Sequence, residues 1–277
     1  MNRQKNLTAI KNQNPIGIFD SGLGGLCILN TVRKHLPFES FIYFADSANC
    51  PYGSKTAEEV LSLSQKTIEF LLECDCKLIV IACNTITAVA IELFRSKYPV
   101  PFIGMEPAIK PATLQSTTGR IGVLATENTF NGNLFKRTFE QYAKGLDVCV
   151  VPGHGLVELV ERGAMNSEKA RLLLEKYLAP MLEKGVDTLV LGCTHYPFLK
   201  DMIASITKNR MVIIDPSDAV AAQTQRILKE FDLNSPKGQT PDQLPKFRFF
   251  TTGSHKTAES LCSRIMEENF VFRKLSL

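Results

Sequence analysis

Two cysteines in similar surroundings are the residues of this chain best suited to chemistry. Cys83 follows the apolar run KLIVIA and precedes Asn84, and Cys193 follows TLVLG and precedes Thr194. A cysteine between a strand and a helix lies near the unpaired N–H groups and dipole of the helix start, which favour the thiolate. We therefore expect the pKa of both thiols to be lowered toward neutrality, as suits residues that transfer protons.

Core packing is the alternative role for each cysteine, because most free cysteines are small buried apolar residues. Packing does not explain polar residues after both Cys83 and Cys193, so the matched pair favours chemistry. The Cys74-x-Cys76 spacing is wrong for a zinc knuckle. Core roles are expected for Cys27, Cys149 and Cys262, a turn role for His154, and a loop position beside the site for Cys50.

Asp20 and His195 are the expected partners of the thiols. Each follows an apolar run, where a carboxylate or an imidazole can orient a thiol or share its proton. Alone, such an aspartate is more often a helix cap and such a histidine a structural hydrogen bonder. Short donors suited to a small, doubly charged substrate also lie at these ends: Ser21, Asn84, Thr85, Thr126 and Thr194.

The glycines of DSGLGG allow a tight turn that brings backbone N–H groups close to an anion. The motif is not a dinucleotide fingerprint, because Cys27 stands where the third glycine would be. No GxxxxGK[ST] run occurs in the sequence either. We therefore expect a small anionic ligand here rather than a nucleotide.

Short apolar runs that alternate with helical patterns must position these residues. Such runs predict parallel strands covered on both faces, and ligands bind beyond the carboxyl ends of such strands. The runs are at residues 16–19, 41–45, 77–82, 101–105, 120–125, 147–151, 188–192, 211–215 and 247–251.

The pattern of strand-end residues repeats along the chain. Asp20 and Cys83 take the places in one stretch that Thr126 and Cys193 take in the next, although two copies of a common α/β pattern can arise by chance. We predict an α/β fold of two similar domains with mainly parallel sheets, related by pseudo-two-fold symmetry, with the active site between them. The expected boundaries are a polar tail at 1–14, a first domain of 15–106 with 216–277, and a second domain of 107–215.

Composition narrows the class of protein. The 277 residues are 44% hydrophobic and 22% charged, enough for an ordinary globular core. No apolar run reaches about 18 to 20 residues and no signal-like stretch opens the chain, so we expect no membrane span. Eight cysteines without an export signal indicate free thiols in the cytoplasm. A net charge of +4 from scattered basic residues gives no reason to expect nucleic acid as a direct partner.

The motifs IGIFDSGLGG, YFADSANCPYG, IVIACNTITA, IGVLAT and LVLGCTHYPFL together resemble the glutamate racemase family of the aspartate/glutamate racemase superfamily. The resemblance implies that Cys83 and Cys193 are the two acid/base residues of a racemase that needs no cofactor or metal and interconverts L- and D-glutamate. It implies that Asp20 and His195 assist them, and that Glu161 lies near the second cysteine. The implied substrate site comprises Asp20, Ser21, Tyr52, Gly53, Asn84, Thr85, Thr194 and His195.

The family resemblance also carries expectations about partners. It implies a homodimer and a supply of D-glutamate to bacterial peptidoglycan synthesis. Some members of the family require a cell-wall precursor as activator, and some have been linked to DNA gyrase. The sequence of this chain decides none of these points.

Several other functions are compatible with the same residues. A related racemase for aspartate, hydantoins or another small acid is the nearest, because one methylene is worth only about 1 to 3 kcal/mol in recognition. Two cysteines argue against a single-cysteine decarboxylase. A zinc-binding or redox protein using Cys83, Cys193 and His195, or a binding module without turnover, is the alternative from another class.

Overall fold

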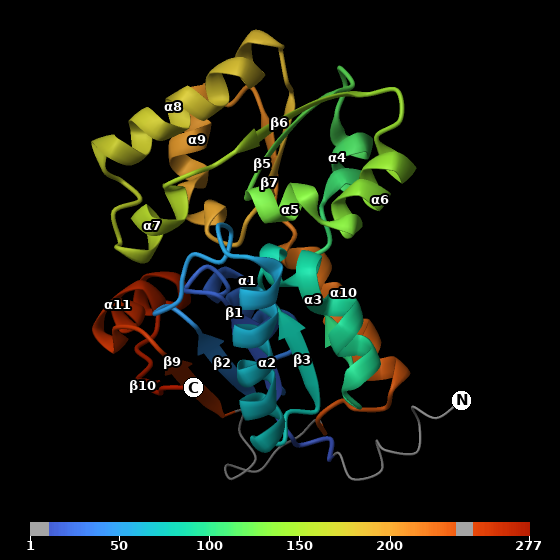
Figure 1. Cartoon of the computed structure of the whole chain (residues 1–277), viewed down its shortest axis with the longest axis vertical. Coiled ribbons are helices and arrows are strands. Elements are labelled where there is room, and N and C mark those ends of the chain that lie inside the picture. Colours follow the sequence, from blue (N-terminus) through green and yellow to red (C-terminus); the bar gives the residue numbers. More distant parts are fainter. Residues whose placement is uncertain (1–10, 237–245) are drawn as a thin grey trace.

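The chain folds into two α/β domains, one above the other in Figure 1. This computed structural model describes residues 11–236 and 246–277. Most of the tail predicted at 1–14 therefore lies outside the described residues. Within them, no helix is long and apolar enough to cross a membrane.

The first domain is built on a six-stranded parallel sheet with the order β10-β9-β2-β1-β3-β4. Helices α1, α10 and α11 pack on one face and α2 and α3 on the other, which buries the central strands. The strands are β1 (Ile16–Asp20), β2 (Phe41–Ala45), β3 (Leu78–Ile81), β4 (Phe102–Ile103), β9 (Phe247–Thr251) and β10 (Phe272–Lys274). The helices are α1 (Leu26–His35), α2 (Ala57–Glu73), α3 (Asn84–Lys97), α10 (Ser217–Glu230) and α11 (His255–Met266).

The second domain repeats the plan with a four-stranded parallel sheet of order β6-β5-β7-β8. Its strands are β5 (Arg120–Ala125), β6 (Asp147–Pro152), β7 (Thr188–Gly192) and β8 (Val212–Ile214). Its helices are α4 (Ile109–Gln115), α5 (Glu127–Asn131), α6 (Asn133–Tyr142), α7 (Leu156–Glu161), α8 (Glu168–Glu183), the 3-10 helix η2 (Tyr196–Leu199) and α9 (Lys200–Thr207).

The two sheets have the same internal order. Read from one edge, the first domain runs β4-β3-β1-β2 and the second runs β8-β7-β5-β6. Strands β3 and β7, which precede Cys83 and Cys193, therefore occupy equivalent places, as do β1 and β5, which precede Asp20 and Thr126. The predicted pair of similar parallel-sheet domains is confirmed.

The chain passes between the sheets after β4 and again after β8, so its last part returns to the first sheet. Strand β9 pairs with β2 in parallel, with Phe41 opposite Phe247. All nine predicted runs form strands, and β10 is the strand that the sequence did not indicate. It is a three-residue edge strand in which only Phe272 is buried, so no apolar run marks it.

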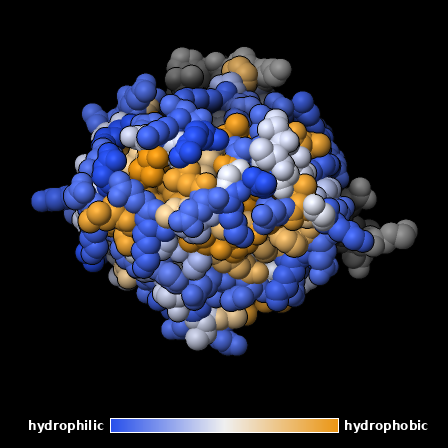
Figure 2. Space-filling model, turned by 90° about the horizontal axis from the view of Figure 1, so that it is seen from above, coloured by the Kyte–Doolittle hydropathy of each residue, from blue (hydrophilic) through white to orange (hydrophobic). Residues whose placement is uncertain are grey.

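Apolar side chains reach the surface of the four-stranded domain. Figure 2, which shows the molecule from above, has a band of hydrophobic residues across this face with hydrophilic residues on both sides. Strand β6 is an edge strand, and its Val150 is 40% exposed. Leu172 on α8 is 57% exposed.

Candidate active site

Cys83 lies where the sequence predicts, as the N-cap of α3 just beyond β3, and is buried. Its Sγ is 3.5 Å from the Oγ of Ser21, to which it donates a hydrogen bond. The expected lowering of its pKa is wrong for this closed arrangement. Burial raises the pKa of the Cys83 thiol and the Asp20 charge adds to this, while contacts with Ser21 and the Ile86 N–H lower it less.

Cys193 follows β7 and is also buried, but no α-helix starts beside it. The next element is the 3-10 helix η2, whose N-cap is His195, and α9 begins only at Lys200. The imidazole takes the place of the expected helix start, because Nδ1 of His195 lies 3.8 Å from the Cys193 Sγ. The two thiols therefore have different partners.

His195 is held by the carboxylate of Glu161, which belongs to the same domain. Its Nε2 lies 2.5 Å from Oε1 of Glu161, and the same oxygen accepts a 2.6 Å hydrogen bond from the Leu23 N–H of the first domain. Burial lowers the pKa of His195, but hydrogen bonds with Cys193, Cys50 and Glu161 together raise it well above its ordinary value. The imidazolium that results can donate Nδ1–H to the Cys193 sulfur.

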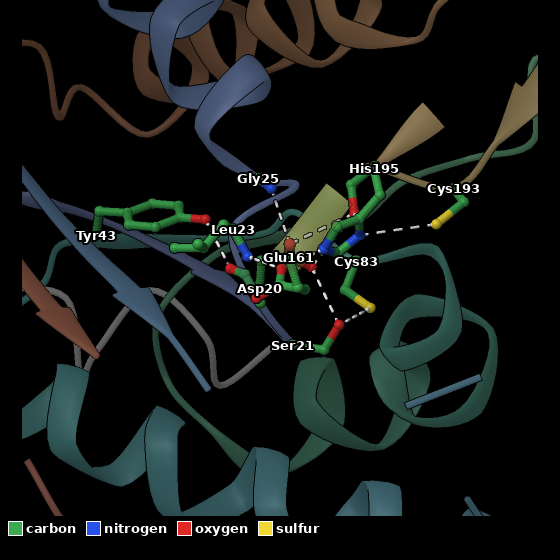
Figure 3. Close-up of polar contacts among 11 residues, drawn as sticks. Asp20, Ser21, Leu23, Gly25, Tyr43, Cys83, Glu161, Cys193 and His195 are labelled. Carbon is green, nitrogen blue, oxygen red and sulfur yellow. Dashed lines mark hydrogen bonds and ion pairs between the residues drawn. The ribbon is translucent and has the colours of Figure 1, made fainter. Parts of the chain in front are cut away.

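Asp20 lies at the end of β1, fully buried, and Figure 3 shows it beside the two cysteines and the histidine. It accepts hydrogen bonds from the Gly25 N–H at 2.8 Å and from Oγ1 of Thr194 at 3.4 Å. Oγ of Ser21 is 3.5 Å from Asp20 Oδ1, so Ser21 contacts both this carboxylate and Cys83. Burial raises the pKa of Asp20 to about 6, against the opposing charge of His195.

The DSGLGG loop packs against the second domain. A Cβ on Gly22 would lie 2.3 Å from Oε1 of Glu161, and one on Gly24 would lie 2.6 Å from Nδ1 of His195. The loop does present N–H groups to anions, as expected, but two of these anions are the protein's own carboxylates, since Leu23 binds Glu161 and Gly25 binds Asp20. Glycine is needed here for close approach between domains.

The two cysteines line one small cavity between the domains. Its volume of about 10 Å³ is room for about one water molecule, so the site is closed in this structure and must open to admit a substrate. Oδ1 of Asn84 is buried and has no hydrogen-bond partner among the described residues, so it is available to a ligand. The lining comprises Ser21, Pro51, Tyr52, Gly53, Cys83, Asn84, Thr85, Thr126, Val157, Cys193, Thr194 and His195.

The loop before α2 forms one wall of this cavity. The Tyr52 hydroxyl donates to Asp46 at 2.5 Å, and Gly53 lies against Thr126, where a Cβ would be 2.9 Å from the threonine Cβ. Asn128 of the second domain donates hydrogen bonds to the Tyr52 carbonyl at 3.3 Å and to a second loop carbonyl, that of Lys55, at 2.9 Å. Sequence reasoning missed Asn128 and Val157, which no motif distinguishes, and gave no role to Asp46 although it lies within the YFADSANCPYG motif.

The residues given structural roles lie apart from the two thiols. All eight cysteines are free, and none of the described donor clusters unites Cys83, Cys193 and His195 as a metal site. His154 is exposed and lines a neighbouring pocket, where its Nε2 lies 3.3 Å from Oε1 of Glu127. The sulfur of Cys50, in contrast, lies within 4.8 Å of a His195 ring nitrogen.

Known proteins are similar to this chain in sequence and fold. The sequence profile of the Asp/Glu/Hydantoin racemase family matches residues 27–224. A glutamate racemase of Herpetosiphon aurantiacus is 48% identical over 223 residues, which cover 80% of this chain and 88% of the relative.

Two solved structures share the fold over nearly the whole chain. The glutamate racemase of Francisella tularensis, in complex with D-glutamate, has a TM-score of 0.81 at 31% identity and covers 96% of this chain and 98% of its own. The Escherichia coli glutamate racemase, in complex with L-glutamate and the activator UDP-MurNAc-ala, has a TM-score of 0.80 at 27% identity and covers 94% and 97%. With its matching strand-end motifs and two-domain site, the chain belongs to the Asp/Glu/Hydantoin racemase family.

Proposed function

We propose that this protein is a glutamate racemase that interconverts L- and D-glutamate without a cofactor, with Cys83 and Cys193 as its two acid/base residues. The observation that carries the proposal is that these thiols line one small cavity from opposite domains. Inversion at a carbon requires a proton to leave from one face and another to arrive on the opposite face. Two thiols on opposite sides of one substrate meet that requirement.

The surroundings of the thiols define a starting state. Burial and the Asp20 charge keep Cys83 protonated, whereas Nδ1 of the His195 imidazolium can donate a hydrogen bond to the Cys193 sulfur when that residue acts as the base. The Cys193 thiolate takes the α-proton, the C–H electron pair moves into the substrate carboxylate, and Cys83 delivers its proton to the opposite face. The reverse reaction exchanges the two roles, and positioning of the reactants can lower the barrier by roughly 7 to 11 kcal/mol.

The described lining of the cavity offers polar groups to the substrate but contains no lysine or arginine. The orphaned Oδ1 of Asn84 and the Asp20 carboxylate are acceptors for the substrate ammonium. The first N–H groups of α3 and the hydroxyls of Thr85, Thr126 and Thr194 are donors for its carboxylates. Such donors also stabilise the carboxylate as it gains carbanion charge.

Glutamate is proposed over aspartate because the two solved relatives were crystallised with D- and L-glutamate. The cavity must then accommodate one more methylene than aspartate has, a difference worth about 1 to 3 kcal/mol. Parallel assays with both amino acids decide the substrate. Equal or greater kcat/KM for aspartate would contradict the proposal.

Family membership extends the proposal to the protein's role and partners. We infer that it acts in the cytoplasm as a homodimer and supplies D-glutamate to bacterial peptidoglycan synthesis. A cell-wall precursor is a candidate activator, because the E. coli relative was crystallised with UDP-MurNAc-ala. Sedimentation velocity of the purified chain tests the dimer, and racemase assays with and without that precursor test the activation.

Substitution of each thiol tests the mechanism. Cys83→Ser and Cys193→Ser should each reduce racemisation of glutamate by at least about 10³-fold, because a serine hydroxyl is too weak an acid to replace the thiol in proton transfer. Circular dichroism spectra should remain those of the wild-type protein. Cys74→Ser is the matched control, since Cys74 caps the far end of α2 and should leave the rate unchanged.

Full activity in either Cys83→Ser or Cys193→Ser would end the two-cysteine mechanism. Absence of racemisation by the wild-type protein, with and without the precursor, would end the proposed function.

A further inference from the structure

Cys50 is the one cysteine beside the cavity that the proposed mechanism does not use. It lies in the loop between β2 and α2, directly before Pro51 and Tyr52 of the cavity wall. Its sulfur lies within 4.8 Å of a ring nitrogen of His195, which belongs to the opposite domain. A Cβ on Gly22 would lie 2.9 Å from the Cys50 sulfur and 2.3 Å from Oε1 of Glu161, so these two atoms meet at one point of the loop.

The cluster combines three different metal-binding side chains. One ligand atom each from Cys50, Glu161 and His195 lies within 4.8 Å of the other two. Thiolate, carboxylate and imidazole are the ligands that Zn²⁺ takes, usually in tetrahedral geometry. Metal–ligand bonds of about 2.0 to 2.3 Å place the ligand atoms roughly 3.3 to 3.6 Å apart, so binding needs only small side-chain shifts.

We propose that Cys50, Glu161 and His195 form a site for Zn²⁺ or a similar divalent metal ion that joins the two domains and inhibits the enzyme. The metal takes the lone pairs of the Cys50 sulfur, Nε2 of His195 and a Glu161 oxygen. The protons held on the sulfur and on Nε2 leave to solvent, and water occupies the fourth position. Thr194 and Cys193, on the Nδ1 side of His195, orient the ring.

Inhibition follows from what these residues do without the metal. The metal displaces the hydrogen bond between His195 and Glu161 that holds the ring against Cys193, so the ring can no longer keep its position beside that sulfur. It also fixes the loop that carries Cys50 against the second domain, which hinders substrate exchange. The inhibition rests on the proposed racemase function, whereas metal binding itself does not.

The test uses the full chain, freed of metal with a chelator, reduced and then titrated with Zn²⁺. We expect one tightly bound Zn²⁺ per chain after desalting and loss of racemisation in proportion to occupancy. Co²⁺ in place of Zn²⁺ should give the near-ultraviolet charge-transfer absorption of a cobalt–thiolate bond. Cys50→Ser should weaken Zn²⁺ binding by at least roughly 100-fold, abolish that absorption and make its remaining racemisation insensitive to added Zn²⁺.

Cys74→Ser is the matched control and should bind Zn²⁺ and lose activity as the wild type does. Glu161→Gln, scored on binding alone, is a second variant and should also bind Zn²⁺ more weakly. Unchanged Zn²⁺ binding by a folded Cys50→Ser protein would show that Cys50 is not a ligand and overturn the proposal, as would no binding by the wild type. A chain that binds Zn²⁺ through Cys50 but racemises no glutamate would overturn the proposed function and leave the metal site intact.

Discussion

The two thiols of the cavity differ in their electrostatic surroundings although their sequence contexts match. Cys193 faces an imidazole that Glu161 holds, while Cys83 faces a hydroxyl and, beyond it, the buried Asp20. A cationic partner favours the thiolate form of a cysteine, whereas burial favours the thiol form. The two sides of the cavity are therefore chemically distinct before substrate arrives.

Asp20 makes activity depend on pH. Its pKa is raised from 3.8 to about 6, chiefly by burial, so it is neutral below that pH and a carboxylate above it. If the carboxylate binds the substrate ammonium, kcat/KM should fall about tenfold per pH unit below pH 6. In Asp20→Asn this dependence should disappear, with kcat/KM uniformly low.

The raised pKa of Asp20 also determines how the free energy of unfolding changes with pH. The folded state holds the extra proton between pH 3.8 and about 6, so the free energy of unfolding falls as pH rises through that window and then levels off. Asp20→Asn should lack this fall, which is of the order of 3 kcal/mol by the shift of about two units. Parallel pH curves for wild type and variant would show that Asp20 does not titrate there.

The Asn84 side chain favours ligand binding and lowers the stability of the free protein. Its buried, unpartnered Oδ1 costs roughly 1 to 3 kcal/mol in the free protein. Asn84→Leu, which replaces the amide by an apolar group of similar size, should raise the free energy of unfolding and lower kcat/KM for glutamate by roughly 10- to 100-fold. Thermal unfolding and steady-state kinetics measure the two effects, and a variant with normal kcat/KM would remove Asn84 from substrate binding.

At the scale of elements, the loop between β1 and α1 controls how closely the domains meet. Gly24 leaves room for both the ring and the backbone N–H of His195, to which a Cβ would lie 2.6 and 2.8 Å away. Backbone cannot yield as a flexible side-chain end can. The glycines of this loop therefore set the position of His195 as well as the course of the turn.

Gly24→Ala should push His195 away from Cys193 and lower kcat/KM by about 10²-fold, the cost of a misplacement of about 1 Å. Gly145→Ala is a control that carries the same added methyl, because nothing lies within 4 Å of its Cβ position. In the Gly145→Ala control, only the strain of an alanine at a backbone φ of 84° is added, so the variant should keep wild-type kinetics. Equal losses of activity in both variants would attribute the effect to general destabilisation.

Apolar runs and strand-end residues were enough to predict nine strands and the meeting of Cys83 with Cys193, because parallel strands bring their carboxyl ends together. The ionisation of Cys83 was predicted wrongly, because the local sequence indicates the helix start but not the packed core that buries the thiol and raises its pKa. Asn128 was missed for a related reason, as its partners lie more than 70 residues away along the chain. Glu161 came from the family resemblance alone.

In the whole molecule, both domains have the same order of strands, which explains how residues at equivalent strand ends come to face each other. The third strand of each domain delivers a cysteine and the first delivers a polar residue, Asp20 or Thr126. Side chains of the two domains then bond directly, through Thr194 to Asp20 and Thr85 to Thr126. The site exists only when both domains meet, and the proposed mechanism then assigns one face of the substrate carbon to each domain.

Two-sided proton transfer can be tested by isotope incorporation in heavy water. L-Glutamate is incubated with the protein in heavy water without cofactor, and both enantiomers are separated at low conversion and analysed for deuterium at the α-carbon. We expect D-glutamate that carries deuterium, because a solvent-exchanged thiol on the opposite face delivers it, while unreacted L-glutamate stays protiated. D-Glutamate that retains the original protium would show a single base acting on both faces and would rule out the two-cysteine mechanism.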